Sequence, residues 1–228
     1  MSETAVLSQY LLVKFTQTFT EASPAQRNEW KEQILRSLTD AVDRFYIYQV
    51  FPAMAEADVL FWLTSKIDDK QTAPARFFER LARCLNPYRM IFTVSRVFWG
   101  YTRPSIYAKG KSSQEINPYA DKRKKYLIVY PFSKTAEWYL LSRETRQGMM
   151  NEHIRVGRQH PEILQLLLYS FGLQDQEFIV SYETDNLFEF SELVNELRST
   201  QARLYTLLDT PIITAIYHPP GETLDLFG

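Results

Sequence analysis

Extended apolar runs and amphipathic segments alternate along the first hundred residues of the chain. Ser23 and Pro24 suit the first positions of a helix, and Ile34 and Leu38 follow on one face of it. A second amphipathic stretch covers 72–85. The remaining apolar runs predict strands at 10–19, 45–51, 59–64 and 89–99. This order, strand–helix–strand–strand–helix–strand, is that of a ferredoxin-like unit.

The same order of elements recurs in the second half of the chain. Leu187, Phe190, Val194 and Leu197 stand at helical spacing and predict a helix over 187–199. Another helix is expected around His153. Strands are expected at 126–132, 167–173, 177–182 and 212–217. The second half therefore predicts a second ferredoxin-like unit.

The segment between the two halves, residues 102–123, is rich in Pro, Ser, Gly and Lys and reads as a linker. Its basic run at 121–125 is expected to be a solvated turn, with a partner surface as the alternative. We expect two domains, at 1–110 and 111–228. Two such units side by side can merge their sheets. The predicted fold class is therefore α+β, with two fused ferredoxin-like units forming a dimeric α+β barrel.

The helix around His153 has an unusual apolar face. Ser142 is a plausible N-cap, and Gly157 suits the other end. The face that contains the histidine consists of Met149, Met150, His153, Val156 and Gly157. Gly157 leaves room for something flat one turn after the imidazole. From the pattern alone, His153 is either a hydrogen-bonded core residue or an axial metal ligand.

Composition narrows the class of protein. The chain has 228 residues, 45% of them hydrophobic, which is enough to bury a sizeable core. The net charge of -1 gives no reason to expect nucleic acid. No apolar run is long enough to predict a membrane span, and the N-terminus lacks the basic start of a signal peptide. These features predict a cytoplasmic protein.

Several kinds of chemistry find no support in the sequence. Cys84 is the single cysteine, so an internal disulfide is excluded, and it is expected to be a small core residue. With three histidines and one cysteine, a zinc cluster is not expected. The chain contains neither a glycine-rich phosphate loop nor a G-x-S-x-G elbow.

Three motifs in the C-terminal half carry a family resemblance. They are KKYLIVYPFSKTAEWYLL at 124–141, YSFGLQDQEFIVSYETD at 169–185 and YTLLDTPIIT at 205–214. This series resembles the chlorite dismutase superfamily of haem proteins, which includes chlorite dismutases and coproheme decarboxylases. The resemblance implies paired ferredoxin-like units, with haem b or coproheme held by the C-terminal one. It also implies a homo-oligomeric ring, commonly a pentamer.

The resemblance assigns roles to four residues. His153 stands in the family's E-H-x-x-x-G pattern and matches the proximal haem ligand. Trp138 matches a tryptophan near the porphyrin, although it could be a core aromatic residue. Tyr130 matches the tyrosine that takes a radical from a propionate in coproheme decarboxylases, although tyrosine is also favoured in strands. Lys134 could pair with a propionate or remain solvated.

The chain also departs from the family pattern. Leu166 occupies the position where chlorite dismutases have arginine and coproheme decarboxylases glutamine. Gln201 matches the glutamate behind the proximal histidine, and Ile116 falls where a propionate-binding arginine is expected. Because leucine cannot stabilise a developing oxyanion, chlorite decomposition is not expected.

Three functional readings follow. The first is a haem or coproheme oxidoreductase that uses hydrogen peroxide, with His153 on the iron and Tyr130 as a radical relay. The second is a carrier or assembly protein that binds a tetrapyrrole without catalysis. The third is a structural homologue without a ligand.

Overall fold

The computed structural model describes residues 5–107 and 112–228 of the chain. Its contacts divide the chain into two compact units, Met1–Thr102 with Thr214–Gly228, and Arg103–Ile213. The division expected from the sequence, 1–110 and 111–228, differs from this one mainly at residues 214–228. Within the described residues, none of the helices has both the length and the apolar character needed to cross a membrane.

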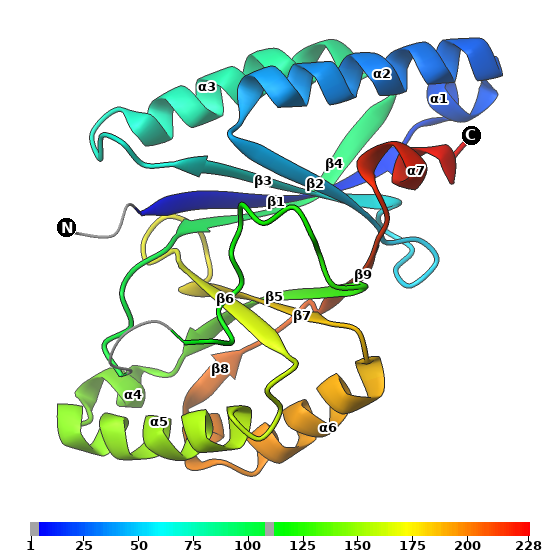
Figure 1. Cartoon of the computed structure of the whole chain (residues 1–228). Helices are drawn as coiled ribbons and strands as arrows, with labels where there is room; N and C mark the ends of the chain where they lie inside the picture. The colour runs from blue at the N-terminus through cyan, green and yellow to red at the C-terminus, as the bar shows by residue number, and fades with distance from the viewer. Residues whose placement is uncertain (1–4, 108–111) are drawn as a thin grey trace. The chain divides into compact units, whose positions relative to one another are not determined.

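The first unit is a four-stranded antiparallel sheet in the order β4-β1-β3-β2, which is the ferredoxin-like order (Figure 1). Two long helices, α2 and α3, lie over one face of it. Its elements are β1 (Val6–Phe15), α1 (Gln17–Glu21), α2 (Pro24–Ala41), β2 (Arg44–Gln49), β3 (Val59–Lys66), α3 (Ala73–Leu85), the short 3-10 helix η1 (Asn86–Tyr88), β4 (Phe92–Tyr101) and α7 (Pro220–Asp225).

Local chemistry explains where these elements begin. The Ser23 hydroxyl accepts the backbone N–H of Gln26 at 3.3 Å, and Pro24 is the first residue of α2. The strand expected at 10–19 is displaced, since β1 begins earlier and ends at Phe15. Phe19 belongs to the helix α1, from which its ring stacks on that of Phe15 with centroids 4.1 Å apart. Burial of this pair in the core stabilises the turn.

The second unit repeats the same strand order, β8-β5-β7-β6. Helices α5 and α6 lie on one face of this sheet (Figure 1). Its elements are β5 (Tyr126–Lys134), α4 (Ala136–Leu140), α5 (Arg143–Gly157), β6 (Leu164–Tyr169), β7 (Phe178–Thr184), α6 (Leu187–Arg198), the 3-10 helix η2 (Gln201–Tyr205) and β8 (Thr206–Leu208). The predicted α+β class with ferredoxin-like units is confirmed.

Other strands also differ from the sequence-based expectation, and the one expected at 167–173 is β6, which begins at Leu164 and ends at Tyr169. The strand expected at 212–217 is β9 (Ile213–Tyr217), and its residues Ile216 and Tyr217 pair with β2 of the first unit. The short strand β8 pairs with the end of β5 and was not predicted. At three residues, β8 is too short to give a periodic signal.

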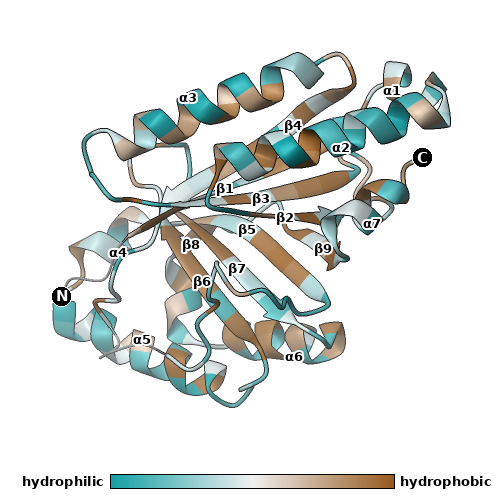
Figure 2. Cartoon of the chain, turned by 45° about the horizontal axis from the view of Figure 1, so that its top comes forward, coloured by the Kyte–Doolittle hydropathy of each residue, from teal (hydrophilic) through white to brown (hydrophobic). Residues whose placement is uncertain are grey.

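The cores of the two units are filled differently. In the first unit, apolar side chains of α2 and α3 pack onto the sheet, and both helices contribute fully buried residues. In the second unit, α6 contributes Phe190 and Leu193, but no residue of α5 is buried. Figure 2 shows the strands of both units mainly in the colour of apolar residues, whereas α5 is largely hydrophilic.

Candidate functional site

The register of the strands decides which side chains of the second unit face its helices. Tyr130 pairs with Val180, and Val180 pairs with Leu167, so these three side chains form one row across the sheet. All three belong to the apolar cluster that also contains Val156 of α5 and Phe190 of α6. This face of the sheet is therefore the one that lies under the His153 helix.

Leu166 lies on the other face of the sheet. Side chains alternate along a strand, and Leu166 pairs with Ser181 while its neighbour Leu167 lies in the row of Tyr130. The structure does not bring Leu166 together with Tyr130. The residue in the row of Tyr130 is the next one along the strand, Leu167. It is also a leucine, so this position is apolar, as expected for Leu166.

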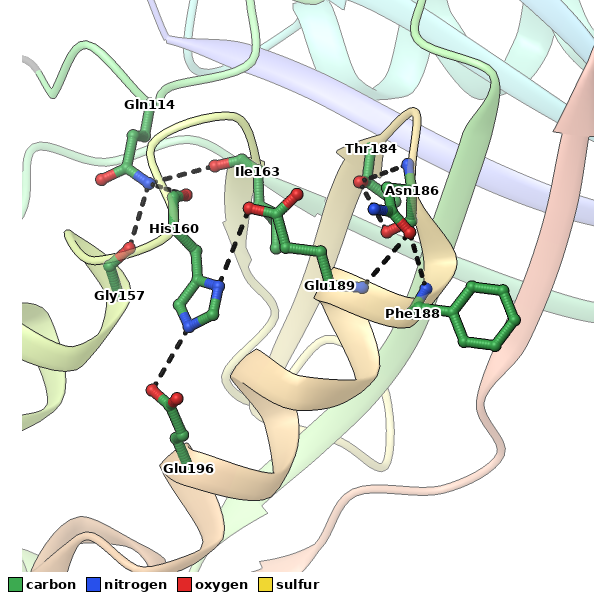
Figure 3. A network of polar contacts seen from close by, with 9 residues as sticks. All are labelled: Gln114, Gly157, His160, Ile163, Thr184, Asn186, Phe188, Glu189 and Glu196. Atoms are coloured by element: carbon green, nitrogen blue, oxygen red, sulfur yellow. Dashed lines mark hydrogen bonds and ion pairs between the residues drawn. The ribbon is translucent and has the colours of Figure 1, made fainter.

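Helix α5 is held at both ends by polar contacts. The Ser142 hydroxyl accepts the backbone N–H of Thr145 at 3.2 Å, as expected for an N-cap. Beyond the other end, the Gln114 side-chain amide donates to the carbonyl oxygens of Gly157, His160 and Ile163 at 3.1, 2.9 and 3.2 Å (Figure 3). Of the three, only Gly157 belongs to α5, and the carbonyl oxygens of Gly157 and His160 also accept the backbone N–H groups of His160 and Ile163. Gln114 therefore adds a cap from a distant segment to the turn that follows α5.

His160 joins the end of α5 to helix α6. Its Nε2 lies 3.2 Å from Glu196 Oε2 and its Nδ1 lies 3.8 Å from Glu189 Oε1 (Figure 3). Both carboxylates stand on α6. His160 is buried, so its polar atoms are satisfied by the protein. This histidine is a structural residue that orients α5 against α6.

His153 differs from His160 in its surroundings. Its Nδ1 is buried and has no hydrogen-bond partner among the described residues. Burial, followed by the nearby charge of Lys134, lowers the pKa of His153 to about 4. The imidazole is therefore neutral at pH 7. A buried, neutral and unpartnered ring nitrogen is unusual in a finished core, and a neutral imidazole is the form that ligates iron.

Lys134 and Trp138 form a compact cluster beside His153. The Lys134 ammonium lies 4.8 Å from the centre of the Trp138 ring and donates to the carbonyl oxygen of Ala202 at 3.1 Å. Burial, followed by the charge of Arg203, lowers the pKa of Lys134 to about 8. Lys134 therefore remains largely protonated at pH 7 and can still pair with a carboxylate.

Tyr130 lies deeper in the sheet and meets Tyr182. Their rings are stacked, with centroids 6.0 Å apart, and their hydroxyl groups are hydrogen-bonded to each other. Burial raises the pKa of Tyr130, and the bond from Tyr182 opposes that effect. Burial also raises the pKa of Tyr182 well above its usual range. Both phenols are therefore protonated at neutral pH, and the hydrogen bond between them places one hydroxyl proton between the two oxygens.

A hollow of about 150 Å³ opens beside Tyr130. Its walls are formed by Tyr130, Phe190, Ser191, Val194, Arg198 and Ile212. Its size is below the roughly 300–1,000 Å³ of ordinary ligand pockets, so it is too small for a macrocycle. His153 is not part of its wall, so the hollow and the histidine are separate features of the same face.

Two further expected residues lie away from this cluster. The Gln201 side chain is exposed, and its backbone N–H donates to Glu152 Oε2 at 3.0 Å. Glu152 is also a nearby charge that raises the pKa of His153 against the effect of burial. The carboxylate associated with the histidine thus comes from the preceding residue of α5, which sequence reasoning missed although it is part of the E-H-x-x-x-G pattern.

The position near Ile116 offers no cation on the face of Tyr130. Ile116 is buried, and Arg123 forms a buried ion pair with Glu183 at 3.3 Å. Glu183 alternates with Tyr182 along β7, so this ion pair lies on the opposite face of the sheet. Arg123 therefore does not replace the missing arginine.

The residues present fit an iron tetrapyrrole. His153 supplies a neutral imidazole, and Lys134 supplies a cation for a propionate. A Cβ atom added at Gly157 would meet nothing within 4 Å, so space is open one turn after His153. The arrangement combines a neutral imidazole, a cation and a buried phenol on one face of the second unit.

Known proteins share both the sequence pattern and the fold. The family model for chlorite dismutase matches residues 25–218. A coproheme decarboxylase from Mycolicibacterium smegmatis is 37% identical over 89 residues, which is 39% of this chain and 38% of that protein. The match thus spans well under half the length of that relative.

Solved structures resemble the chain over nearly its full length. A variant of chlorite dismutase from Candidatus Nitrospira defluvii in complex with cyanide has a TM-score of 0.85 at 19% identity, covering 99% of this chain and 96% of that one. Another variant of the same enzyme has a TM-score of 0.84 at 20% identity, with coverage of 99% and 97%. At this identity the likeness is one of fold.

Proposed function

Because this chain belongs to the chlorite dismutase family, we propose that it binds haem b or coproheme and acts as a haem-dependent oxidoreductase with hydrogen peroxide. The observation that carries the proposal is His153. Its imidazole is neutral, the buried Nδ1 atom has no partner among the described residues, and the helix itself has no fully buried residue. A ligand that covers α5 would satisfy both the nitrogen and the helix face.

Each residue of the cluster has a distinct role in this proposal. His153 holds the iron, while the carboxylate of Glu152 favours electron density on the imidazole. Lys134 pairs with a propionate, and Trp138 forms a flat apolar wall beside it. When bound, the iron porphyrin supplies the oxidising chemistry with peroxide. The protein excludes water and fixes the orientation.

Tyr130 is the residue proposed to relay a radical. Its phenol is protonated because burial raises its pKa, so it can give up a proton and an electron together. The hydroxyl of Tyr182 is hydrogen-bonded to it and stabilises the oxygen from which the proton leaves. The phenoxyl radical that remains after this loss would then take a hydrogen atom from a propionate, which restores the phenol and leaves the radical on the propionate.

A carrier function without catalysis is the second candidate. It is favoured by the row across the sheet, in which Tyr130 has the apolar neighbours Val180 and Leu167. A polar donor on this face would stabilise charge that develops during cleavage of an O–Cl or O–O bond, and neither neighbour supplies one. We therefore expect slow peroxide chemistry and no efficient chlorite decomposition.

Assembly and location complete the proposal. The family resemblance implies a homo-oligomer, with a pentamer as the expected form, and light scattering coupled to size-exclusion chromatography tests it. The cytoplasmic location expected from the sequence remains a prediction.

The test of function is a pair of assays. The coproheme complex is mixed with hydrogen peroxide, and propionate loss is followed by mass spectrometry. Slow loss of propionate supports the enzymatic function if its rate falls by about 10²-fold or more in Tyr130→Phe. Loss that persists in this variant contradicts the radical role.

The second assay mixes the haem complex with chlorite. Rapid oxygen release would show that the apolar row does not face the reacting oxygen. A stable complex that reacts in neither assay would identify a carrier.

A further inference from the structure

Glu177 joins the two segments that carry Lys134 and Trp138. It stands just before β7, and its Oε2 atom accepts the backbone N–H of Lys134 at 2.7 Å and the hydroxyl of Tyr139 at 2.6 Å. Tyr139 follows Trp138 in α4, so one carboxylate oxygen holds the end of β5 and the helix α4 together. Hydrogen bonds to an ionised carboxylate are stronger than those between neutral groups, so this link is a firm one.

The backbone of Glu177 is fixed as well. Its N–H donates to the Ser133 hydroxyl at 3.2 Å, and its carbonyl oxygen accepts the N–H of Ser170 at 2.8 Å. These two bonds tie Glu177 to β5 and to the residue that follows β6. The carboxylate therefore reaches Lys134 and Tyr139 from an anchored position.

The Lys134 ammonium is seated by contacts on the other side of this link. It lies 4.8 Å from the centre of the Trp138 ring, and it donates to the carbonyl oxygen of Ala202 at 3.1 Å and to the Thr206 hydroxyl at 3.4 Å. An ammonium has three N–H donors, so these bonds leave one for an anion. Burial is the main cause that lowers the pKa of Lys134, and the negative charge of Glu177 opposes it.

We propose that Glu177 is a positioning residue that holds the Lys134 ammonium over the Trp138 ring, ready for an anionic group of the tetrapyrrole. The inference rests on the proposed function and deepens it. Glu177 acts through Lys134 rather than on the porphyrin, because its Oε2 atom is taken up by the two donors from β5 and α4.

The first test is a double-mutant cycle. The porphyrin that the unmodified protein binds more tightly, coproheme or haem b, is titrated into the unmodified protein, Glu177→Ala, Lys134→Met and the double variant, and binding is followed by the Soret absorbance. We expect Glu177→Ala to weaken binding by about 5–20-fold, but by less than about 2-fold in the Lys134→Met background.

The control for this cycle is Glu162→Ala. It removes an exposed carboxylate that lies 3.7 Å from Lys124, so it matches the change in net charge and should leave the binding constant unchanged. If Glu177→Ala weakens binding by the same factor with and without the Lys134 ammonium, Glu177 merely stabilises the fold, and the inference is overturned.

The second test needs no porphyrin. Acrylamide quenching of Trp138 fluorescence, taken as the difference between each variant and its Trp138→Phe counterpart, reports how firmly α4 is held. Glu177→Ala should raise the quenching constant by about twofold. Glu177→Gln, whose amide oxygen can still accept both donors, should restore the quenching constant and most of the porphyrin affinity. An unchanged quenching constant in Glu177→Ala would contradict the positioning role.

The outcomes distinguish this inference from the function on which it rests. If the unmodified protein binds neither porphyrin, the proposed function fails and the role of Glu177 in binding fails with it. If the protein binds porphyrin through His153 and the cycle is additive, only the role of Glu177 fails. Circular dichroism of each variant before titration confirms that the comparison is between folded proteins.

Discussion

The two units share a strand order but differ in what their helices do. In the first unit, Ile34 and Leu38 of α2 and Phe77 and Leu81 of α3 are each at most 3% exposed. In the second unit, α5 has no buried residue, although it lies over the same kind of sheet. The core of the first unit is thus filled by its own side chains, whereas the second unit has a helix face that its own sheet covers only in part. Under the proposed function, this face of α5 is where the tetrapyrrole would lie.

Ionisable groups show the same contrast. In the second unit, burial is the main cause of a shifted pKa for several groups. In the first unit, this is so for a single described group, Cys84. Those of the second unit are Tyr130, Lys134, Tyr139, His153, Tyr169 and Tyr182. Perturbed groups gather at functional sites, because chemistry needs charges in places that water cannot reach.

The largest expected effect concerns packing. Phe77→Ala removes a fully buried ring of α3 and should lower the free energy of unfolding by about 3–5 kcal/mol. Met150→Ala, on the partly exposed face of α5, should cost about 1 kcal/mol or less. Urea denaturation of the protein without porphyrin measures both. Equal losses would mean that α5 is packed as tightly as the helices of the first unit.

A smaller effect on the free energy of unfolding is expected when the pH is lowered. The pKa of His153 is about 4 in the folded protein and 6.5 in an unfolded chain, so the unfolded chain binds more protons between these values. Stability contributed by the neutral imidazole is present above pH 6.5 and is lost as the pH falls toward 4. The loss should be on the order of 1–3 kcal/mol.

Replacing the imidazole tests this dependence. His153→Phe cannot titrate, so its free energy of unfolding should fall less than that of the unmodified protein between pH 7 and pH 4.5. Denaturation curves of both proteins at the two pH values give the difference. Parallel pH dependences would show that His153 titrates normally, and would weaken the contrast between the units.

The smallest expected effect concerns the end of α5. Gln114→Ala removes the donor to three carbonyl groups and should cost about 1–2 kcal/mol. Amide exchange should accelerate mainly in the last turn of α5. Gln26→Ala, which breaks an exposed contact with Glu29 in the first unit, is the matched control and should cost less than about 0.5 kcal/mol. Unchanged exchange in α5 would refute the capping role.

Periodicity was enough to predict most of the fold. The helix beginning at Pro24 and the helix around His153 were found because caps and apolar spacing agreed. The short strand β8 gave no such signal. The face of the sheet on which Leu166 lies could not be predicted, because a shift of one residue in a strand reverses the side chain and register is set by partners far along the chain.

The candidate site was less predictable than the fold. His153 was found because it interrupts an apolar stripe, and its role remains a prediction. The ion pair between Arg198, which lines the hollow, and Asp209 was not found, since the two stand eleven residues apart and meet only through the turn that η2 makes. Charged residues at such spacing are common on surfaces, so the sequence does not show which of them form ion pairs.

The central claim is that α5 presents His153 to a bound tetrapyrrole iron. The most direct test is a Soret titration with haem b and with coproheme of the unmodified protein, His153→Ala and His218→Ala. His218 lies in the first unit, where it is hydrogen-bonded to Gln49 at 3.0 Å, and serves as the matched control. We predict saturation at one porphyrin per chain for the unmodified protein and for His218→Ala. His153→Ala should lose the band or bind at least about 100-fold more weakly. An unchanged spectrum and affinity in His153→Ala would contradict the claim.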